Sequence, residues 1–154
     1  MRVAIGSDHA GFEQKQQLID YINGLGHIAI DCGPATDERC DYPDYALKVG
    51  LRVAQDWADR GVLVCGTGIG MALAADKIAG CRASSITSPE FAVLARQHND
   101  LNIITLSGRF VDFETNCAIV KAFLETKFEG GRHALRVAKV MELDPDVLPS
   151  LIDG

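Results

Sequence analysis

The chain has 154 residues, of which 47% are hydrophobic and 23% charged, a composition typical of one globular domain with a substantial core. Its net charge of −6 argues against a nucleic-acid-binding or membrane-surface protein. No apolar run approaches the roughly 20 residues that span a bilayer, and the N-terminus leads directly into a strand-like segment, so we expect neither a membrane anchor nor a signal peptide.

The first half of the chain alternates between strand and helix patterns. Val3–Gly6 reads as a strand, and the stretch from Gly11 to Leu25 has apolar residues along one helical face. His27–Asp31 reads as a second strand. From Asp44 to Trp57 apolar residues recur at the spacing of an amphipathic helix.

The second half continues this alternation. Ser88 followed by proline is typical of a helix N-terminus. The predicted strands are Val62–Cys65, Arg82–Ile86 and Ile103–Leu106, and the predicted helices run from the glycines after Cys65 to about Lys77, over Pro89–His98, over Phe113–Thr126 and from about Arg132 to Met141.

Five strands alternating with helices predict a parallel sheet with helices on both faces, a three-layer αβα Rossmann-like α/β fold. We expect the strand order 2-1-3-4-5. Residues 1–142 would form a single domain, and residues 143–154, which include two prolines, an irregular arm that could lie on a partner subunit.

In such sheets ligands bind beyond the carboxyl ends of the strands, where the strand order reverses. For the expected order, the reversal lies between the first and third strands. The segments that leave these strands, Ser7–Gly11 and Cys65–Gly70, are polar and rich in glycine. The sequence therefore predicts that both face one crevice.

The segment Cys65–Gly70 combines a cysteine with three glycines in alternate positions. Such a turn crowds backbone N–H groups together, and the following helix start favours negative charge, including a thiolate. Cys65 is therefore a candidate nucleophile or base, although a cysteine at the end of a buried strand is usually inert. Thr67 is a candidate hydroxyl donor or a simple turn residue. The spacing lacks the features of a P-loop or a dinucleotide fingerprint, so we expect no nucleotide cofactor.

Other polar residues have ordinary structural alternatives. Asp8 and His9 could offer a carboxylate and an imidazole to a hydroxylated substrate, or cap the next helix. His98 could simply interact with the end of its helix. Arg132, Arg136 and Lys139 form a basic face that suits a phosphate, which Arg109 could join, although basic faces are usually only solvated.

Five motifs together resemble ribose-5-phosphate isomerase type B, a family that includes galactose-6-phosphate and allose-6-phosphate isomerases. The resemblance extends from Met1 to about Val140. The motifs are Ser7-Asp8-His9-Ala10-Gly11, Asp41-Tyr42-Pro43-Asp44, Cys65-Gly66-Thr67-Gly68-Ile69-Gly70, Arg96-Gln97-His98-Asn99-Asp100 and Phe128-Glu129-Gly130-Gly131-Arg132-His133.

The resemblance implies an aldose–ketose isomerase that uses no metal or cofactor and works through a cis-enediol. It assigns proton transfer between C1 and C2 to Cys65, ring opening to His98 and the ordering of sugar hydroxyls to Asp8. Thr67 and the amides of Gly66–Gly70 would stabilise the enediolate oxygen. The remaining expected substrate contacts are His9, Arg132 and Arg136 to the phosphate, together with Tyr42, Ile69, Asn99 and Arg109.

The resemblance further implies a homodimer or tetramer whose subunits complete each other's sites, with a small sugar phosphate as ligand. The net charge argues against a nucleic-acid or membrane partner, and the five scattered cysteines fit a reducing cytoplasm. Ribose 5-phosphate and ribulose 5-phosphate are the expected substrates. The same chemistry on a six-carbon sugar phosphate and a non-catalytic sugar-phosphate-binding subunit are the alternatives.

The chain departs from the family pattern at three places. Asp76 stands where asparagine is usual, Thr87-Ser88-Pro89 replaces a pair that often contains histidine or asparagine, and Leu135 stands where a polar residue is common. None of these positions adjoins the expected base.

Overall fold

The computed structural model describes residues 1–143, so the predicted arm lies almost wholly outside the described residues. Within this part the expected strands and helices are all present. The strands are β1 (Arg2–Ser7), β2 (Ile28–Asp31), β3 (Arg60–Cys65), β4 (Ala83–Ser85) and β5 (Ile103–Ser107). The helices are α1 (Phe12–Gly24), α2 (Tyr42–Ala54), α3 (Ile69–Ala75), α4 (Pro89–Asn99), α5 (Phe113–Glu125) and α6 (Arg132–Met141).

The five strands form one parallel sheet in the order β2-β1-β3-β5-β4. The expected α/β class is confirmed, but the expected positions of the last two strands are wrong. β5 is buried along its whole length and pairs with β3, whereas β4 is three residues long and only partly buried. The less apolar strand therefore takes the edge, where half of its backbone groups need no strand partner.

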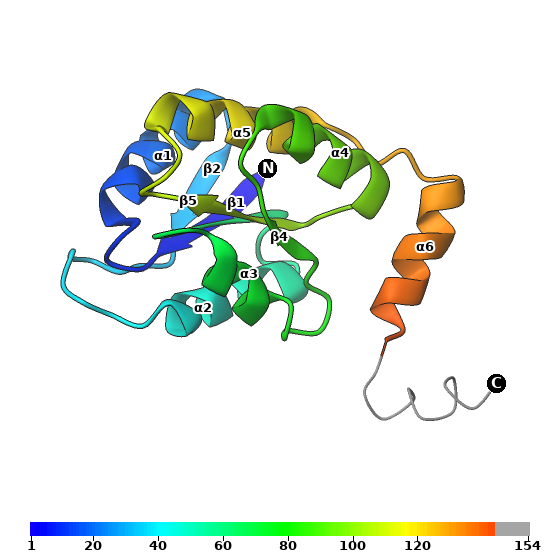
Figure 1. The fold of residues 1–154 in the computed structure, drawn as a ribbon, viewed down its shortest axis with the longest axis horizontal. Coiled ribbons are helices and arrows are strands. Elements are labelled where there is room, and N and C mark those ends of the chain that lie inside the picture. Colours follow the sequence, from blue (N-terminus) through cyan, green and yellow to red (C-terminus); the bar gives the residue numbers. More distant parts are fainter. Residues whose placement is uncertain (144–154) are drawn as a thin grey trace.

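The strand order explains which helices cover each face of the sheet. The chain moves one way across the sheet through α2 and α3 and the opposite way through α1 and α4. Right-handed crossovers therefore place these pairs on opposite faces. Figure 1 shows α2 and α3 on one side of the sheet and α1, α4 and α5 on the other.

The core consists of two apolar clusters, one on each face of the sheet. Alternate residues of β3 divide between them, because successive side chains of a strand point to opposite faces. Val62 and Val64 belong to the cluster under α1, α4 and α5. Leu63 and Cys65 belong to the cluster under α2 and α3.

Helix α6 stands apart from the three layers, beside the end of α4 (Figure 1). His133 is its only buried residue, while Leu135 and Val140 are largely exposed. Within residues 1–143, no helix is both long enough and apolar enough to cross a membrane.

Candidate active site

The carboxyl ends of β1 and β3 lie side by side. Ser7 pairs with Val64 in the sheet, and the Asp8 N–H donates a hydrogen bond of 3.1 Å to the Val64 carbonyl. The segments Ser7–Gly11 and Cys65–Gly70 therefore leave neighbouring strands at the same edge, as the sequence predicts. The revised strand order adds the end of β5 on the other side of β3.

Two hydroxyl groups of β5 hold the turn after Cys65 through hydrogen bonds. The Thr105 hydroxyl donates to the Gly68 carbonyl at 2.7 Å, and the Ser107 hydroxyl donates to the Gly66 carbonyl at 2.8 Å. Gly68 has a φ of 82°, and a Cβ there would lie 2.7 Å from the Ser85 hydroxyl oxygen. The turn thus requires glycine at this position, both for its conformation and for its packing.

Cys65 lies at the base of this turn, with only 4% of its surface exposed. The Gly68 N–H donates a hydrogen bond to its Sγ atom over 3.1 Å. A backbone donor therefore faces the sulfur that the family resemblance assigns to proton transfer. Thr67 is exposed, and its Oγ1 accepts a hydrogen bond of 3.3 Å from the Ile69 N–H.

Asp8 serves first as a structural acceptor. Its Oδ1 atom accepts hydrogen bonds from the N–H groups of Ala10 and Gly11, at 2.8 and 3.1 Å. Both bonds use the same oxygen, so Oδ2 is the atom that could meet a substrate hydroxyl. His9 lies beside the loop before α2, with its Nδ1 3.3 Å from the Cys40 carbonyl oxygen and 3.5 Å from the Cys40 nitrogen.

Tyr42 and Arg109 border the glycine turn from opposite ends. A Cβ at Gly70 would lie 2.8 Å from the Tyr42 ring, so the ring packs directly against the start of α3. A Cβ at Gly66 would lie 3.7 Å from a guanidinium nitrogen of Arg109. Arg109 therefore belongs to the Cys65 side of the molecule and, within one chain, does not join the basic face of α6.

The other predicted site residues lie elsewhere in the chain's structure. His98 and Asn99 end α4, which starts beyond the carboxyl end of edge strand β4 and runs back across the sheet for about 16 Å. Arg132 and Arg136 project from α6, beside that end of α4. The structure thus divides the predicted site into a Cys65 group at the carboxyl end of the central strand β3 and a His98 group at the C-terminal end of α4.

The His98 group borders a groove of about 1410 Å³ between α6, α4 and the β4 edge. Its walls include His98, Asn99 and Arg136 together with exposed Phe91 and Leu94. The end of α4 is fixed by Asp100, whose carboxylate forms ion pairs of 2.7 Å with Arg96 and 2.9 Å with Arg82.

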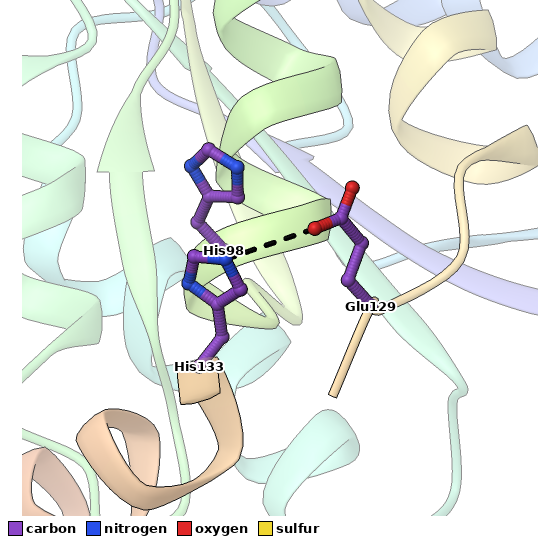
Figure 2. Close-up of side chains that lie close together, drawn as sticks. All are labelled: His98, Glu129 and His133. Atoms are coloured by element: carbon purple, nitrogen blue, oxygen red, sulfur yellow. Dashed lines mark ion pairs between the residues drawn. The ribbon is translucent and has the colours of Figure 1, made fainter. Parts of the chain in front are cut away.

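His98 stacks on His133, with ring centroids 4.3 Å apart and ring planes inclined by 8° (Figure 2). Glu129 lies beside the pair, its Oε2 3.7 Å from the His133 Nε2. The three side chains place one ligand atom each within 4.8 Å of one another, so they are candidate metal ligands. Parallel rings, however, direct their nitrogen lone pairs alongside one another and not toward a shared point, so this arrangement does not fit a metal ion.

Sequence reasoning missed two kinds of residue. Thr105 and Ser107, which hold the glycine turn, are polar residues in a buried strand, a signal that each needs a hydrogen-bond partner. The expected strand order hid that partner because it separated β5 from β3. His133 and Glu129 lie in one of the five motifs, but nothing in their spacing indicates a stack on His98.

A family model described as Ribose/Galactose Isomerase matches residues 3–140. The chain belongs to this family. It is 42% identical to the ribose-5-phosphate isomerase B of Escherichia coli over 93% of this chain and 96% of the relative. A structure of that enzyme from Clostridium thermocellum superposes with a TM-score of 0.91 at 42% identity, covering 92% and 96% of the two chains. The Mycoplasma genitalium enzyme with bound ribulose-5-phosphate superposes at 0.87, with 39% identity and coverage of 91% and 93%.

The departures from the isomerase pattern have local structural roles. Asp76 accepts a 2.7 Å hydrogen bond from the Ala83 N–H, and burial raises the pKa of its carboxyl group. Ser88 accepts from the Phe91 N–H at 3.4 Å and caps α4, as its sequence context predicts. Leu135 is 72% exposed, so it plays no part in the core of the described chain.

Proposed function

We propose that this chain, with residues 1–142 as one domain, interconverts ribose 5-phosphate and ribulose 5-phosphate. The observation that carries this proposal is the Gly68 N–H directed at the buried Cys65 sulfur, within a family of sugar isomerases. A relative of similar fold binds ribulose-5-phosphate. A proton-transferring base must lie beside the reacting carbons. The glycine turn is therefore assigned to the enediolate, and the phosphate to the arginines.

In the proposed mechanism, the Cys65 thiolate removes the C2 proton of the open-chain aldose. The electron pair passes through the new C1–C2 double bond to the carbonyl oxygen, which becomes an enediolate stabilised by the amides of Gly66–Gly70 and by Thr67. Cys65 then returns the proton to C1, while the proton of the C2 hydroxyl passes to the enediolate oxygen on C1 and the C2 oxygen becomes the ketone. Asp8 orders the remaining hydroxyls through Oδ2, and Tyr42 and Ile69 border the sugar.

Ring opening is assigned to His98 of a second copy of the chain. Within one chain, Cys65 ends the central strand β3, whereas His98 lies in the last turn of α4, which follows the edge strand β4. The groove, the unpaired β4 edge and the exposed apolar residues of α6 form a surface that a second chain can bury. A homodimer, alone or as half of a tetramer, would then supply His98, Asn99, Arg132 and Arg136 to the Cys65 group of the other subunit.

The phosphate is assigned to Arg132 and Arg136, joined across the interface by His9 and Arg109. Guanidinium groups bind phosphate oxygens through paired N–H donors. All five cysteines are free thiols, which supports a reducing cytoplasm as the place of the reaction. Cys65 and His98 favour catalysis over a binding-only subunit, because binding alone needs neither a base nor a ring-opening group.

Comparison of kcat/KM for ribose 5-phosphate, allose 6-phosphate and galactose 6-phosphate tests this proposal, with EDTA present throughout. We expect ribose 5-phosphate to give the highest value and EDTA to have no effect. A higher kcat/KM for a six-carbon sugar phosphate would show that this sugar phosphate, and not ribose 5-phosphate, is the preferred substrate. Absence of turnover on all three would contradict isomerase activity.

A further inference from the structure

We propose that His133, which lies beside Glu129, is a positioning residue for His98. This inference rests on the proposed function, because it assigns His133 a role only through the ring-opening histidine. Three observations carry it: the stacked geometry of the two imidazoles, the burial of His133 in an otherwise exposed helix, and the connections that tie the loop before α6 to α4.

The stack fixes the plane of the His98 ring. The centroids are 4.3 Å apart and the planes almost parallel, which leaves the other face and the edge of the His98 ring directed away from His133 (Figure 2). An isolated histidine at a helix end can rotate about both side-chain bonds. A stacked partner restricts this rotation, and pairs of this kind contribute beyond their buried area.

His133 is itself held by its surroundings. Its backbone N–H donates to the Gly130 carbonyl at 3.0 Å, and the Glu129 N–H donates to the Gln97 carbonyl at 3.2 Å, which joins the loop to the last turn of α4. The His133 Nε2 accepts from the Arg132 Nε–H at 3.4 Å and lies 3.7 Å from the Glu129 carboxylate. The stack therefore connects α6 to α4 at the position where His98 acts.

The charges around His133 favour its neutral form. The groups that face it are His98 from α4, Glu129 from the preceding loop, and Arg132 and Arg136 from α6. Burial lowers the pKa of His133, as do the neighbouring His98 and the two arginines, and Glu129 opposes them. A neutral partner lets His98 gain and lose a proton without a like charge stacked on its ring.

The test separates ring opening from proton transfer at carbon. Ribulose 5-phosphate cannot form a furanose ring because its O5 carries the phosphate, so exchange of its C1 hydrogen with D2O needs Cys65 but no ring opening. Ribose 5-phosphate must open its ring before it reacts. For each variant, kcat for ribose 5-phosphate and the C1 exchange rate of ribulose 5-phosphate are measured by NMR on the assembled full-length protein.

We expect His98→Asn to reduce kcat for ribose 5-phosphate by about a hundredfold while exchange is largely retained. His133→Ala should produce the same selective pattern at about tenfold. His133→Phe, which can stack but not titrate, should recover most of the loss. Glu129→Gln, which keeps a polar group beside the His133 ring, should cause a smaller selective loss of kcat for ribose 5-phosphate. This variant tests the positioning role if His133→Ala does not fold.

Equal losses in both assays for His133→Ala and Glu129→Gln would overturn the positioning role, since they would indicate general damage to the site or its assembly. Unchanged turnover in both variants, or a His133→Phe variant as impaired as His133→Ala, would also overturn it. Failure of the proposed function would be distinguishable, because the unmodified protein would then turn over no ribose 5-phosphate, or His98→Asn would lose both activities equally.

Discussion

The Cys65 turn and the His98 end of α4 differ in how completely one chain builds them. The Cys65 turn is buried and is held by hydroxyl groups of the central strand β5. The His98 end borders an open groove, beside a helix whose apolar residues are mostly exposed. In the proposed mechanism, the proton-transfer group would therefore be preorganised within a single chain, whereas the ring-opening and phosphate groups would act on the substrate bound to a second chain.

Loss of the base should have the largest effect. Cys65→Ala is expected to lower both isomerisation and C1 exchange by roughly a thousandfold or more, because the group assigned to accept the carbon-bound proton is removed. Cys117→Ala is the matched control, since burial raises the pKa of the Cys117 thiol and keeps it protonated. Near-normal turnover of ribose 5-phosphate by Cys65→Ala would show that Cys65 is not the base.

Loss of a phosphate contact should have a smaller effect, concentrated in KM. Arg136→Ala is expected to raise KM for ribose 5-phosphate by about tenfold or more and to weaken inhibition by inorganic phosphate, because a charge-assisted contact is lost. Lys121→Ala, which removes an exposed positive charge from α5, should change neither value. Unaltered phosphate inhibition in Arg136→Ala would place the phosphate elsewhere.

The rigidity of the turn can be tested with two glycines of almost identical φ. Gly68 has a φ of 82° and is closely packed, whereas Gly26 has a φ of 83° and would meet no atom within 4 Å if a Cβ were added. We expect Gly26→Ala to cost about 1 kcal/mol from backbone strain, and Gly68→Ala about 2 to 4 kcal/mol in urea unfolding, because packing adds to strain. Equal losses would show that the turn can relax.

Asp76 should have the smallest effect, visible only in the pH dependence of stability. Burial raises the pKa of its carboxyl group, so the folded state holds the proton more tightly than the unfolded state. Its contribution is therefore favourable at low pH and is lost as pH rises through the folded pKa. Asp76→Asn, which can keep the bond from the Ala83 N–H, should raise Tm at pH 7 and lose this advantage below about pH 4. A pH-independent change would contradict the burial effect.

The elements of the fold could be predicted from apolar periodicity, because that pattern records which face of each strand or helix is buried. The order of β4 and β5 could not, although Ala83-Ser84-Ser85 is visibly less apolar than Ile103–Ser107. The adjacency of the carboxyl ends of β1 and β3 depends only on the pairing of two parallel strands and was predictable. The separation of His98 from Cys65 depends on the direction of α4, and the His98–His133 stack depends on the placement of α6. Neither the direction nor the placement can be read from residue spacing.

The division of the site between two chains can be tested most directly by mixing two inactive variants. Cys65→Ala and His98→Asn are combined, their subunits exchanged, and turnover of ribose 5-phosphate measured. If each site joins Cys65 of one chain to His98 of the other, half of the sites in mixed dimers are intact, and random exchange restores about a quarter of the unmodified activity. If both residues act within one chain, every site in every dimer lacks one of them, and the mixture stays inactive.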